Sequence, residues 1–464
     1  MKRITTRYLH RLFLTCTAAL IAIPFANAAD QPLSFVGKDE WLFYRVEFSN
    51  TTDEAATNTS IDLIRRLNKV LATNGVTMAF TMVPLKARIY AEHLPDDVKI
   101  NSYMEGNYDR MENALRAGQV SVIDLNQPFL NSPLRGGDTP FFFRLDTHWA
   151  PTGAMLAGET IGTEINAHPA LKKALDATPE IKFGMAWAKH KVNSTARGQV
   201  DGLPKGSPTF GIEQELPFTV TKEQTETPSL LGEGSDAEIT LMGSSYSAPW
   251  YLLPDALRYT LQREVLGVSV EATHGSWVGM ESYLRDDSFQ TRKPKLLIWE
   301  MPERDMRMPP DYPYREERYH SDNTEWLLRA AAWAQSKCTP SPAAAKIVSG
   351  GLAVTEADHV STGKTGDRDF IEVNFSKPIE KLDYIVASVA TSGSKKLVLE
   401  ASGTGVETRW FDVPVPGNGT EHALKSPLPS DGKGFTKLRI FPGKSSAFTF
   451  KGLQVCRQPD DLLK

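Results

Sequence analysis

The sequence has few cysteines, no low-complexity tract and no apolar segment long enough to span a bilayer. Its 464 residues include 3 cysteines, and 41% are apolar while 23% are charged. This composition is typical of a soluble globular protein and excludes a fibrous or largely disordered chain. Because a domain usually holds about 100–200 residues, the length favours two domains.

A basic excess is also absent. The formal net charge is −4, and the residues from 341 onward contain 16 Lys and Arg against 14 Asp and Glu. Neither the residues from 341 onward nor the rest of the chain has the positive field of a nucleic-acid-binding protein, so we do not expect nucleic acid as a partner. An acidic ligand would have to be met by local basic clusters rather than by overall charge.

The first 28 residues are predicted to be a signal peptide. Basic residues precede an apolar stretch from Leu12 to Phe25, and the Ala-Asn-Ala at 26–28 has the small-x-small form that signal peptidase cleaves. A membrane anchor is the alternative, but about 14 apolar residues fall short of the roughly 20 that a spanning helix needs. We therefore expect an exported, periplasmic protein whose mature chain begins near Ala29.

Export would leave two cysteines, Cys338 and Cys456, because Cys16 lies in the leader. In an oxidising compartment two remaining cysteines most simply pair with each other. The loop so closed would hold about 118 residues, which chain-entropy arguments associate with roughly 4–5 kcal/mol of stability. Two buried, unpaired thiols are the alternative.

Between about residues 35 and 335, buried strand-like runs alternate with helical patterns. The runs at 76–85, 120–125, 238–243 and 295–302 are continuously apolar, and residues 63–75 show helical spacing that ends on Asn-Gly. Continuous apolar strands separated by helices indicate an α/β fold whose parallel sheet is covered on both faces.

The pattern changes after Cys338. Short alternating runs such as "FIEVNF", "YIVASVA", "KLVLEA" and "KLRIF" are separated by turns every eight to twelve residues. This rhythm predicts an all-β sandwich. We place the boundary near 339–346 and expect a first domain of residues 29–340 and a second of 341–464.

A nucleophile is predicted at the end of the strand at 238–243. The strand runs into "GSSYS" and then into residues 250–267, which we predict to be one helix. When a strand is followed by a glycine turn, a serine and a helix, the serine hydroxyl is exposed at the edge of the sheet. The N–H groups at the start of the helix can then face an oxyanion. We expect Ser245 to be the nucleophile, because it lies in the turn, whereas Ser247 suits a helix cap.

Serine needs an adjacent base, and His148 is the best candidate among eight histidines outside the leader. Asp146 precedes it by two residues, and in an extended loop positions i and i+2 point the same way, so the carboxylate can hold the imidazole. The alternative is an ordinary loop histidine with a satisfied neighbour. A metal site is not expected, because no His-x-x-x-His or equivalent cluster supplies the ligands.

The combination resembles the AlgX-type alginate O-acetyltransferase family. The segments that carry the resemblance, in order along nearly the whole mature chain, are "GKDEWLFYRVEF", "TMVPLKARIYAEHLP", "RLDTHWAPTGA", "GSSYSAPW" and "LIWEMPER". The resemblance implies a permuted SGNH-hydrolase-like domain followed by a carbohydrate-binding β-sandwich, without a cofactor. It also implies Asp146 as orienter, His148 as base and Ser245 as nucleophile. In ordinary SGNH hydrolases the serine precedes the His/Asp pair; here it follows, as permutation requires.

One feature departs from the family. Its AlgX members carry an extra disulfide in the catalytic domain, which a chain with two mature cysteines cannot form.

Four further residues are candidates for binding substrate. Tyr251 stands where the family places a substrate-contacting tyrosine, although a core aromatic is the alternative. Arg304 could meet a uronate carboxylate with two hydrogen bonds, or could form a structural ion pair. Trp410 could stack on a sugar ring with Arg409 beside it, although core packing is the commoner role of a sandwich tryptophan.

The resemblance implies transfer of an acetyl group to mannuronate residues of alginate through an acyl-enzyme. Acetyl-CoA should be absent outside the cytoplasm, so a membrane-bound protein would have to deliver the acetyl group. Components of an outer-membrane secretion complex are implied as further partners. An acetylesterase of the same fold and a non-catalytic polysaccharide-binding scaffold are the alternatives.

Overall fold

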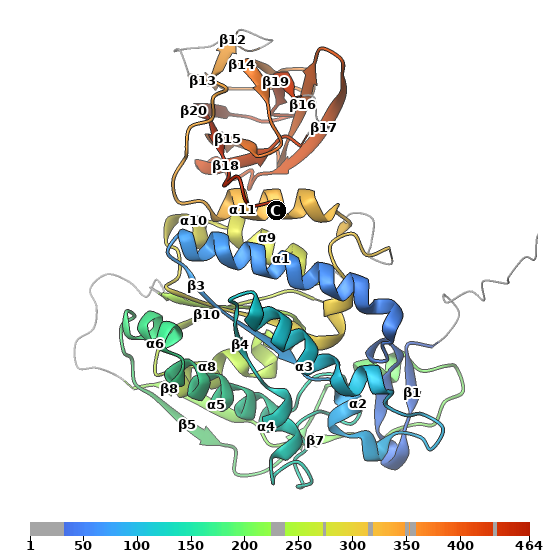
Figure 1. Ribbon diagram of the computed structural model, residues 1–464. Helices are drawn as coiled ribbons and strands as arrows, with labels where there is room; N and C mark the ends of the chain where they lie inside the picture. Colours follow the sequence, from blue (N-terminus) through green and yellow to red (C-terminus); the bar gives the residue numbers. More distant parts are fainter. Residues whose placement is uncertain are drawn as a thin grey trace, which may run out of the picture.

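A five-stranded parallel sheet forms the centre of the N-terminal unit in the computed structural model (Figure 1). The structure describes residues 32–223, 237–271, 275–313, 319–348, 352, 359–429 and 434–464. In spatial order the strands are β10 (Val265–Ser269), β9 (Ile239–Gly243), β11 (Leu296–Pro302), β3 (Thr77–Val83) and β4 (Ser121–Ile123). Every neighbouring pair is parallel, so all five carboxyl ends lie at one edge. The predicted α/β sheet is confirmed.

Helices cover both faces of this sheet. On one face lie α1 (Glu54–Thr73), α3 (Ser102–Ala117), α9 (Gly275–Arg285) and α11 (Asn323–Ala334). On the other lie α4 (Asn126–Asn131), α5 (Pro151–Ala167), α6 (Pro169–Asp176) and α8 (Leu253–Leu261). Successive strand residues divide between the two cores: Met242 packs with the first set of helices and Leu241 with the second. This alternation explains why the strands are apolar throughout.

Short elements complete the unit. They are β1 (Ser34–Val36), β2 (Leu42–Tyr44), α2 (Lys86–Ile89), β5 (Phe183–Trp187), β6 (Val192–Asn193), α7 (Gly198–Asp201), β7 (Gln214–Glu215), β8 (Phe218–Lys222) and α10 (Asp287–Thr291). None of the helices in the described ranges has the length and apolar character that crossing a membrane requires.

The prediction of one helix over residues 250–267 is wrong. Helix α8 ends at Leu261, where Gln262 adopts a left-handed conformation with φ 53°. The following residues form β10, which pairs in parallel with β9. Apolar residues at helical spacing continue through this stretch, and only the open edge of the sheet selects a strand for its second half.

The C-terminal unit is a sandwich of two antiparallel sheets. One contains β12 (Ala345–Val348), β14 (Ile371–Ile379), β19 (Phe435–Phe441), β16 (Lys396–Gly403) and β17 (Val406–Pro414). The other contains β13 (His359–Thr362), β20 (Phe448–Arg457), β15 (Asp383–Thr391) and β18 (His422–Pro427). Their inner faces enclose one apolar core. The predicted sandwich is confirmed.

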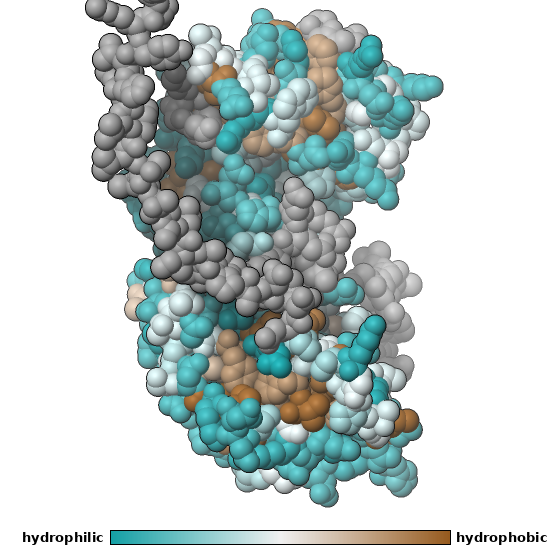
Figure 2. Space-filling view, turned by 90° about the vertical axis from the view of Figure 1, so that its right-hand side faces the viewer, coloured by the Kyte–Doolittle hydropathy of each residue, from teal (hydrophilic) through white to brown (hydrophobic). Residues whose placement is uncertain are grey.

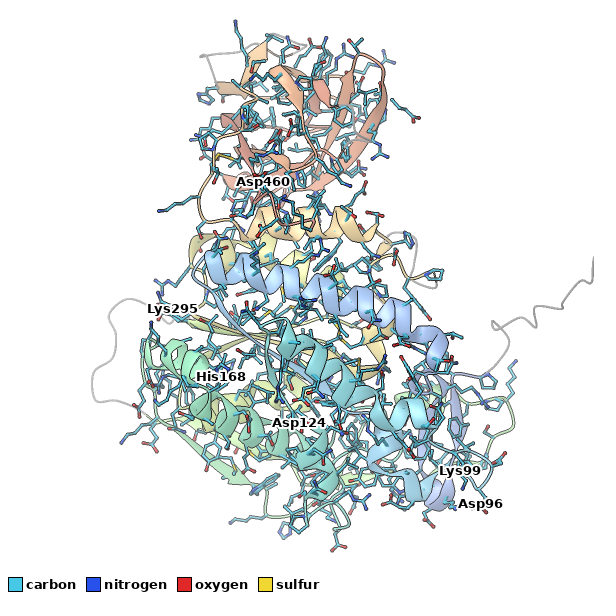
Figure 3. The ribbon with its side chains drawn as sticks, viewed as in Figure 1. Asp96, Lys99, Asp124, His168, Lys295 and Asp460 are labelled. Atoms are coloured by element: carbon cyan, nitrogen blue, oxygen red, sulfur yellow. A yellow bond between two sulfur atoms is a disulfide. The ribbon has the colours of Figure 1, made fainter. Side chains whose placement is uncertain are left out.

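The two units meet at α11, which lies between the sandwich and α1 in Figure 1. A disulfide joins Cys338, just after α11, to Cys456 in β20. After β20 the chain returns to the α/β unit: Leu462 is buried in the core beside α1, and Lys69 pairs with Asp461. Figure 3 places Asp460 at this junction. The sequence analysis assigned the residues after β20 to the sandwich, because no local sequence pattern indicates that they contact the α/β unit.

Candidate active site

The structure brings Asp146, His148 and Ser245 into one hydrogen-bonded chain. The Nδ1 atom of His148 lies 2.5 Å from Oδ1 of Asp146, and its Nε2 atom lies 2.7 Å from Oγ of Ser245. The histidine and the serine are 97 residues apart in the sequence. A nucleophile, a base and an orienting carboxylate within hydrogen-bond reach are the arrangement that acyl transfer requires.

The loop that carries the acid and the base is held mainly by the carboxylate of Asp146. Its oxygens also accept hydrogen bonds from the backbone N–H of His148, at 3.0 Å, and of Gly198. Burial raises the pKa of Asp146, but the hydrogen bond and charge of His148, with the two N–H donors, lower it below its usual value. Burial lowers the pKa of His148, against the opposing effect of Asp146. At neutral pH the imidazole is therefore uncharged and able to accept a proton.

A buried lysine supports the same loop from behind. The Nζ atom of Lys86 donates to the carbonyl oxygens of Arg144 and Asp146 at 3.0 and 2.8 Å, and to Oε1 of Gln199 at 2.7 Å. Burial lowers the pKa of Lys86 to about 7. Sequence reasoning missed this residue. Its position soon after β3, at the carboxyl edge of the sheet, was the signal that could have found it.

The candidate nucleophile, Ser245, lies on a 3-10 turn, Ser245–Ser247, directly after β9. The prediction that Ser247 caps the following helix is wrong. Ser244 caps the turn, because its Oγ accepts the N–H of Tyr246 at 3.2 Å, whereas Oγ of Ser247 donates to a carboxylate oxygen of Glu300 at 2.8 Å. The cap lies one residue before the nucleophile because the helical turn begins at Ser245 itself.

Few N–H groups of this turn are available to an oxyanion. The N–H of Ser244 donates to Glu300, that of Tyr246 to Oγ of Ser244, and that of Ser247 to the carbonyl of Ser244. Within the described residues, the N–H of Ser245 has no hydrogen-bond partner. It is therefore the amide of the turn that can stabilise negative charge on a carbonyl attacked by its own side chain.

Trp250 and Tyr251 lie just beyond the turn that carries Ser245. The ring of Tyr251 stacks on the imidazole of His148, with centroids 3.9 Å apart and planes at 15°. Burial raises the pKa of Tyr251, so it remains a neutral phenol that covers one face of the base. The neighbouring Trp250 is 70% exposed, which is unusual for so large a ring. Sequence reasoning did not select it, because only the structure reveals its exposure.

Arg304 lies near the site but is engaged by the protein. Its Nη1 atom donates to Oγ1 of Thr147 and to the hydroxyl of Tyr246, both at 3.1 Å. Only 11% of its side chain is exposed. Burial opposes its charge, but Tyr246, Asp305 and Glu47 raise the pKa of the guanidinium, which stays positive. Arg304 therefore ties the loop residue between Asp146 and His148 to the nucleophile turn.

The structure places Arg409 and Trp410 on β17, at the junction of the two units. Nη1 of Arg409 lies 3.5 Å from Oε1 of Glu325 on α11 and from the carbonyl of Pro429. Trp410 is 59% exposed and packs on Phe441 with ring centroids 5.8 Å apart.

Trp410 lines a cavity of about 550 Å³ between the two units. The walls of the cavity mix aromatic rings with charged groups, among them Arg285, Arg329, Lys425, Glu281, Glu325 and Asp412. Figure 2 shows a mostly hydrophilic surface on which hydrophobic residues gather in patches on both units. Flat rings among hydrogen-bonding groups suit a polar, ring-containing polymer better than an apolar ligand.

Comparison with known proteins gives this geometry its context. The family model described as the SGNH hydrolase-like domain of acetyltransferase AlgX matches residues 35–303. The chain belongs to the AlgX-type acetyltransferase family. The match covers the sheet, the loop with Asp146 and His148, and the turn with Ser245.

Two relatives of the chain carry alginate-related names. The probable alginate O-acetylase AlgJ of Pseudomonas putida is 28% identical over 291 residues, covering 61% of this chain and 72% of the relative. The alginate biosynthesis protein AlgX of Azotobacter vinelandii is 24% identical over 363 residues, covering 75% of this chain and 69% of the relative.

A solved structure extends the likeness of fold to the sandwich. The structure of Pseudomonas aeruginosa AlgX superimposes with a TM-score of 0.64 and 15% identity, covering 92% of this chain and 94% of that one. Like this AlgX-type chain, the matched structure therefore spans both units. In the described part of the chain no group of three or more His, Cys, Asp or Glu side chains is placed to hold a metal ion.

Proposed function

We propose that this protein transfers acetyl groups to mannuronate hydroxyls of alginate through an acyl-enzyme on Ser245. The observation that carries the proposal is the hydrogen-bonded chain from Asp146 through His148 to Ser245, in a member of an acetyltransferase family. The names of the relatives, alginate O-acetylase and alginate biosynthesis protein, support alginate as the substrate class.

The first half of the reaction acylates the serine. Nε2 of His148 accepts the proton of Ser245 as Oγ attacks the acetyl carbonyl of the donor, and the N–H of Ser245 meets the oxyanion. Asp146 stabilises the imidazolium that forms. The bond to the leaving group breaks as His148 returns the proton to it, and acetyl-Ser245 remains.

The second half reverses these roles with a sugar as the acceptor. His148 removes the proton of a mannuronate hydroxyl, whose oxygen attacks the acyl-serine carbonyl. The ester to the sugar forms, the bond to Ser245 breaks, and the serine recovers its proton. Water in place of the sugar would make the protein an esterase, so excluding water from the acyl-enzyme distinguishes the two activities.

The proposed polymer contacts come from exposed aromatic rings. Trp250, next to the tyrosine that covers the base, would stack on the acceptor sugar. Trp410 and Arg409 would hold the polymer at the sandwich. Tyr251 would contact the sugar while keeping the imidazole in place. We assign Arg304 to holding the His148 loop, in place of the sugar contact predicted from the sequence, because its guanidinium is already hydrogen-bonded to that loop.

The setting of the reaction is also proposed. The signal peptide over residues 1–28 lies outside the described residues, and with it the periplasmic location rests on the sequence. We propose an acetyltransferase domain of residues 29–340 and a carbohydrate-binding domain of residues 341–464, which the disulfide between Cys338 and Cys456 links covalently. A membrane-bound protein would supply the acetyl group, and outer-membrane secretion components would receive the product.

Acetylation of a mannuronate oligomer tests the proposal. Purified protein would receive the oligomer and p-nitrophenyl acetate as a surrogate donor, with acetylated oligomer measured by mass spectrometry. Ser245→Ala is expected to lower transfer by about 10⁴-fold or more. Ser361→Ala, an exposed serine of β13, is the control and should leave transfer unchanged. Release of acetate without acetylated oligomer would instead identify an esterase, and equal transfer by Ser245→Ala would identify a scaffold.

A further inference from the structure

A buried carboxylate lies directly beneath the nucleophile turn. Glu300, in β11, has 0% exposure. Its oxygens accept hydrogen bonds from the N–H of Ser244 at 2.8 Å, from Oγ of Ser244 at 2.9 and 3.0 Å, and from Oγ of Ser247 at 2.8 Å. Glu300 therefore contacts the turn on both sides of Ser245 without contacting the nucleophile itself.

The backbone of the turn leaves room for this carboxylate. The register of the sheet pairs Trp299 with Met242, which brings Glu300 beside Gly243. A Cβ atom at Gly243 would lie 2.5 Å from Oε2 of Glu300 and 2.1 Å from Oγ of Ser247. Such distances are not tolerated between heavy atoms, so the glycine before the nucleophile is needed for the carboxylate to reach the turn.

Burial at this position is unfavourable for a carboxylate. Glu300 forms no ion pair within the described residues, so the hydrogen bonds of the turn alone compensate its burial. Burial raises its pKa to about 7, although the hydrogen bonds from Ser247 and Ser244 lower it. Unpaired buried carboxylates are disfavoured in a packed core, and their pKa shifts concentrate at functional sites.

These contacts also decide which groups of the turn remain free. Because the hydroxyl of Ser247 is committed to Glu300, it cannot compete for Nε2 of His148. Oγ of Ser244, itself held by Glu300, accepts the N–H of Tyr246, and within the described residues the N–H of Ser245 has no partner. One hydroxyl and one amide, both of Ser245, are thus left facing the site.

We propose that Glu300 is a positioning residue that orients the Ser244–Ser247 turn, so that Oγ of Ser245 meets His148 and the N–H of Ser245 is available to the oxyanion. The inference rests on the proposed function for the role of Ser245. It goes beyond it by assigning the alignment of the nucleophile to a carboxylate that touches neither substrate nor base.

Acylation of Ser245 by p-nitrophenyl acetate, together with kcat and KM for the oligomer acceptor, tests this role. Glu300→Leu is expected to lower the acylation rate about 100-fold, as displacement of a reacting group by about 1 Å does, with the acceptor KM unchanged within about twofold. Glu300→Gln should restore the rate to within about tenfold of wild type, because an amide still accepts the N–H of Ser244 and the serine hydroxyls can either donate or accept.

Glu112→Gln is the matched control. The pKa of Glu112 is also raised by burial to about 7, but this residue lies on α3 and pairs with Arg116. The control should leave both the acylation rate and KM unchanged. If Glu300→Leu does not fold, Ser247→Ala removes one of the same hydrogen bonds and is expected to lower the acylation rate about fivefold to tenfold, in line with the loss of roughly 1 kcal/mol.

Several results would overturn the proposal. The first is a wild-type acylation rate in folded Glu300→Leu, and the second is a wild-type acylation rate in Ser247→Ala. The third is an equal loss of acylation rate in Glu300→Gln and Glu300→Leu that is explained by their lower melting temperatures alone. Absence of any Ser245 acylation in the wild type would overturn this inference and the proposed function together. Normal acylation without transfer to mannuronate would remove the proposed function alone, because the acylation assay does not involve the polymer.

Discussion

The two units of the molecule bury very different side chains. The α/β unit buries charged groups around and behind its carboxyl edge, including Glu47, Lys86, Asp146 and Glu300. In the described part of the sandwich, Asp383 is the one charged side chain that is buried. Burying a charge is unfavourable unless hydrogen bonds or opposite charges compensate it. The α/β unit therefore bears the unfavourable desolvation of several buried charged groups, which the described part of the sandwich largely avoids.

A second contrast concerns where the contacts come from. In the sandwich, the core is formed by apolar side chains from the inner faces of two antiparallel sheets. In the site, Lys86, Asp146 and Ser245 belong to three segments far apart in the sequence. Substitutions in the site should therefore change the rate of the reaction, while substitutions in the sandwich should change stability or polymer binding.

Apart from replacement of Ser245 itself, the largest effect is expected for Asp146→Asn. The amide cannot stabilise the imidazolium and can favour the wrong tautomer of His148, so the rate of Ser245 acylation should fall by about 10⁴-fold. Burst kinetics with p-nitrophenyl acetate measure this rate. Asp383→Asn, at the buried carboxylate of the sandwich that bonds Arg457, is the control, and it should lower the melting temperature without changing acylation. A slower reaction in the control would contradict the division of roles.

The next effect concerns stability alone. Replacing Cys338 and Cys456 together by alanine opens a loop of 118 residues, which should reduce the free energy of unfolding by roughly 4–5 kcal/mol. Denaturant titration with and without reductant measures the loss, and reduced wild type should match the double variant. Acylation by the folded fraction should stay at the wild-type rate. A loss of acylation before unfolding would show that the disulfide also supports the site.

Acidification should affect the site before it affects the sandwich. His148 must be neutral to accept the serine proton, and burial places its pKa below the ordinary value of 6.5. The part of the acylation rate that depends on His148 should therefore be constant above that value and fall about tenfold per pH unit once the pH drops below the pKa of His148. The pH profile of the acylation burst checks this. The pH profile of Glu300→Gln, which lacks the carboxyl group with a pKa of about 7, isolates the titration of His148. If the rate begins to fall above pH 6.5 in both the wild type and Glu300→Gln, the assignment of the fall to His148 is refuted.

The smallest effect is expected at the sandwich surface. Trp410→Ala should raise KM for long mannuronate oligomers about fivefold, in line with a loss of about 1 kcal/mol for one aromatic contact. Acylation by p-nitrophenyl acetate should not change. Trp187→Ala is the matched control, because this ring on β5 is also exposed, at 37%, and no polymer contact is assigned to it. An unchanged KM in Trp410→Ala would remove the sandwich from the polymer path.

Much of the fold could be predicted because its signals are local. Continuous apolar runs matched β3, β9 and β11 to within a few residues, and alternating runs matched β14 to β16. The error over residues 250–267 arose where one apolar pattern fits both a helix and an edge strand. The return of the C-terminal residues to α1 was missed because it depends on a surface that forms only when both units have folded.

The candidate site divides in the same way. Asp146 and His148 could be recognised because two residues of one loop suffice to show the pair, and Ser245 because a glycine turn after a strand is a local signal. Lys86 had one weak signal, its position after a strand at the carboxyl edge of the sheet, whereas Glu300 had none, because a glutamate within a strand is ordinary by itself. Their roles follow only from what the sheet places beside them.

The sequence by itself therefore determined the two-unit architecture and the chemical types available for reaction, because periodicity and motifs are properties of neighbouring residues. The tertiary structure alone decided that an early imidazole meets a late hydroxyl, that a buried carboxylate aligns the turn, and that Arg304 serves the loop. Those outcomes depend on the order and register of parallel strands, which bring distant segments to one edge of the sheet.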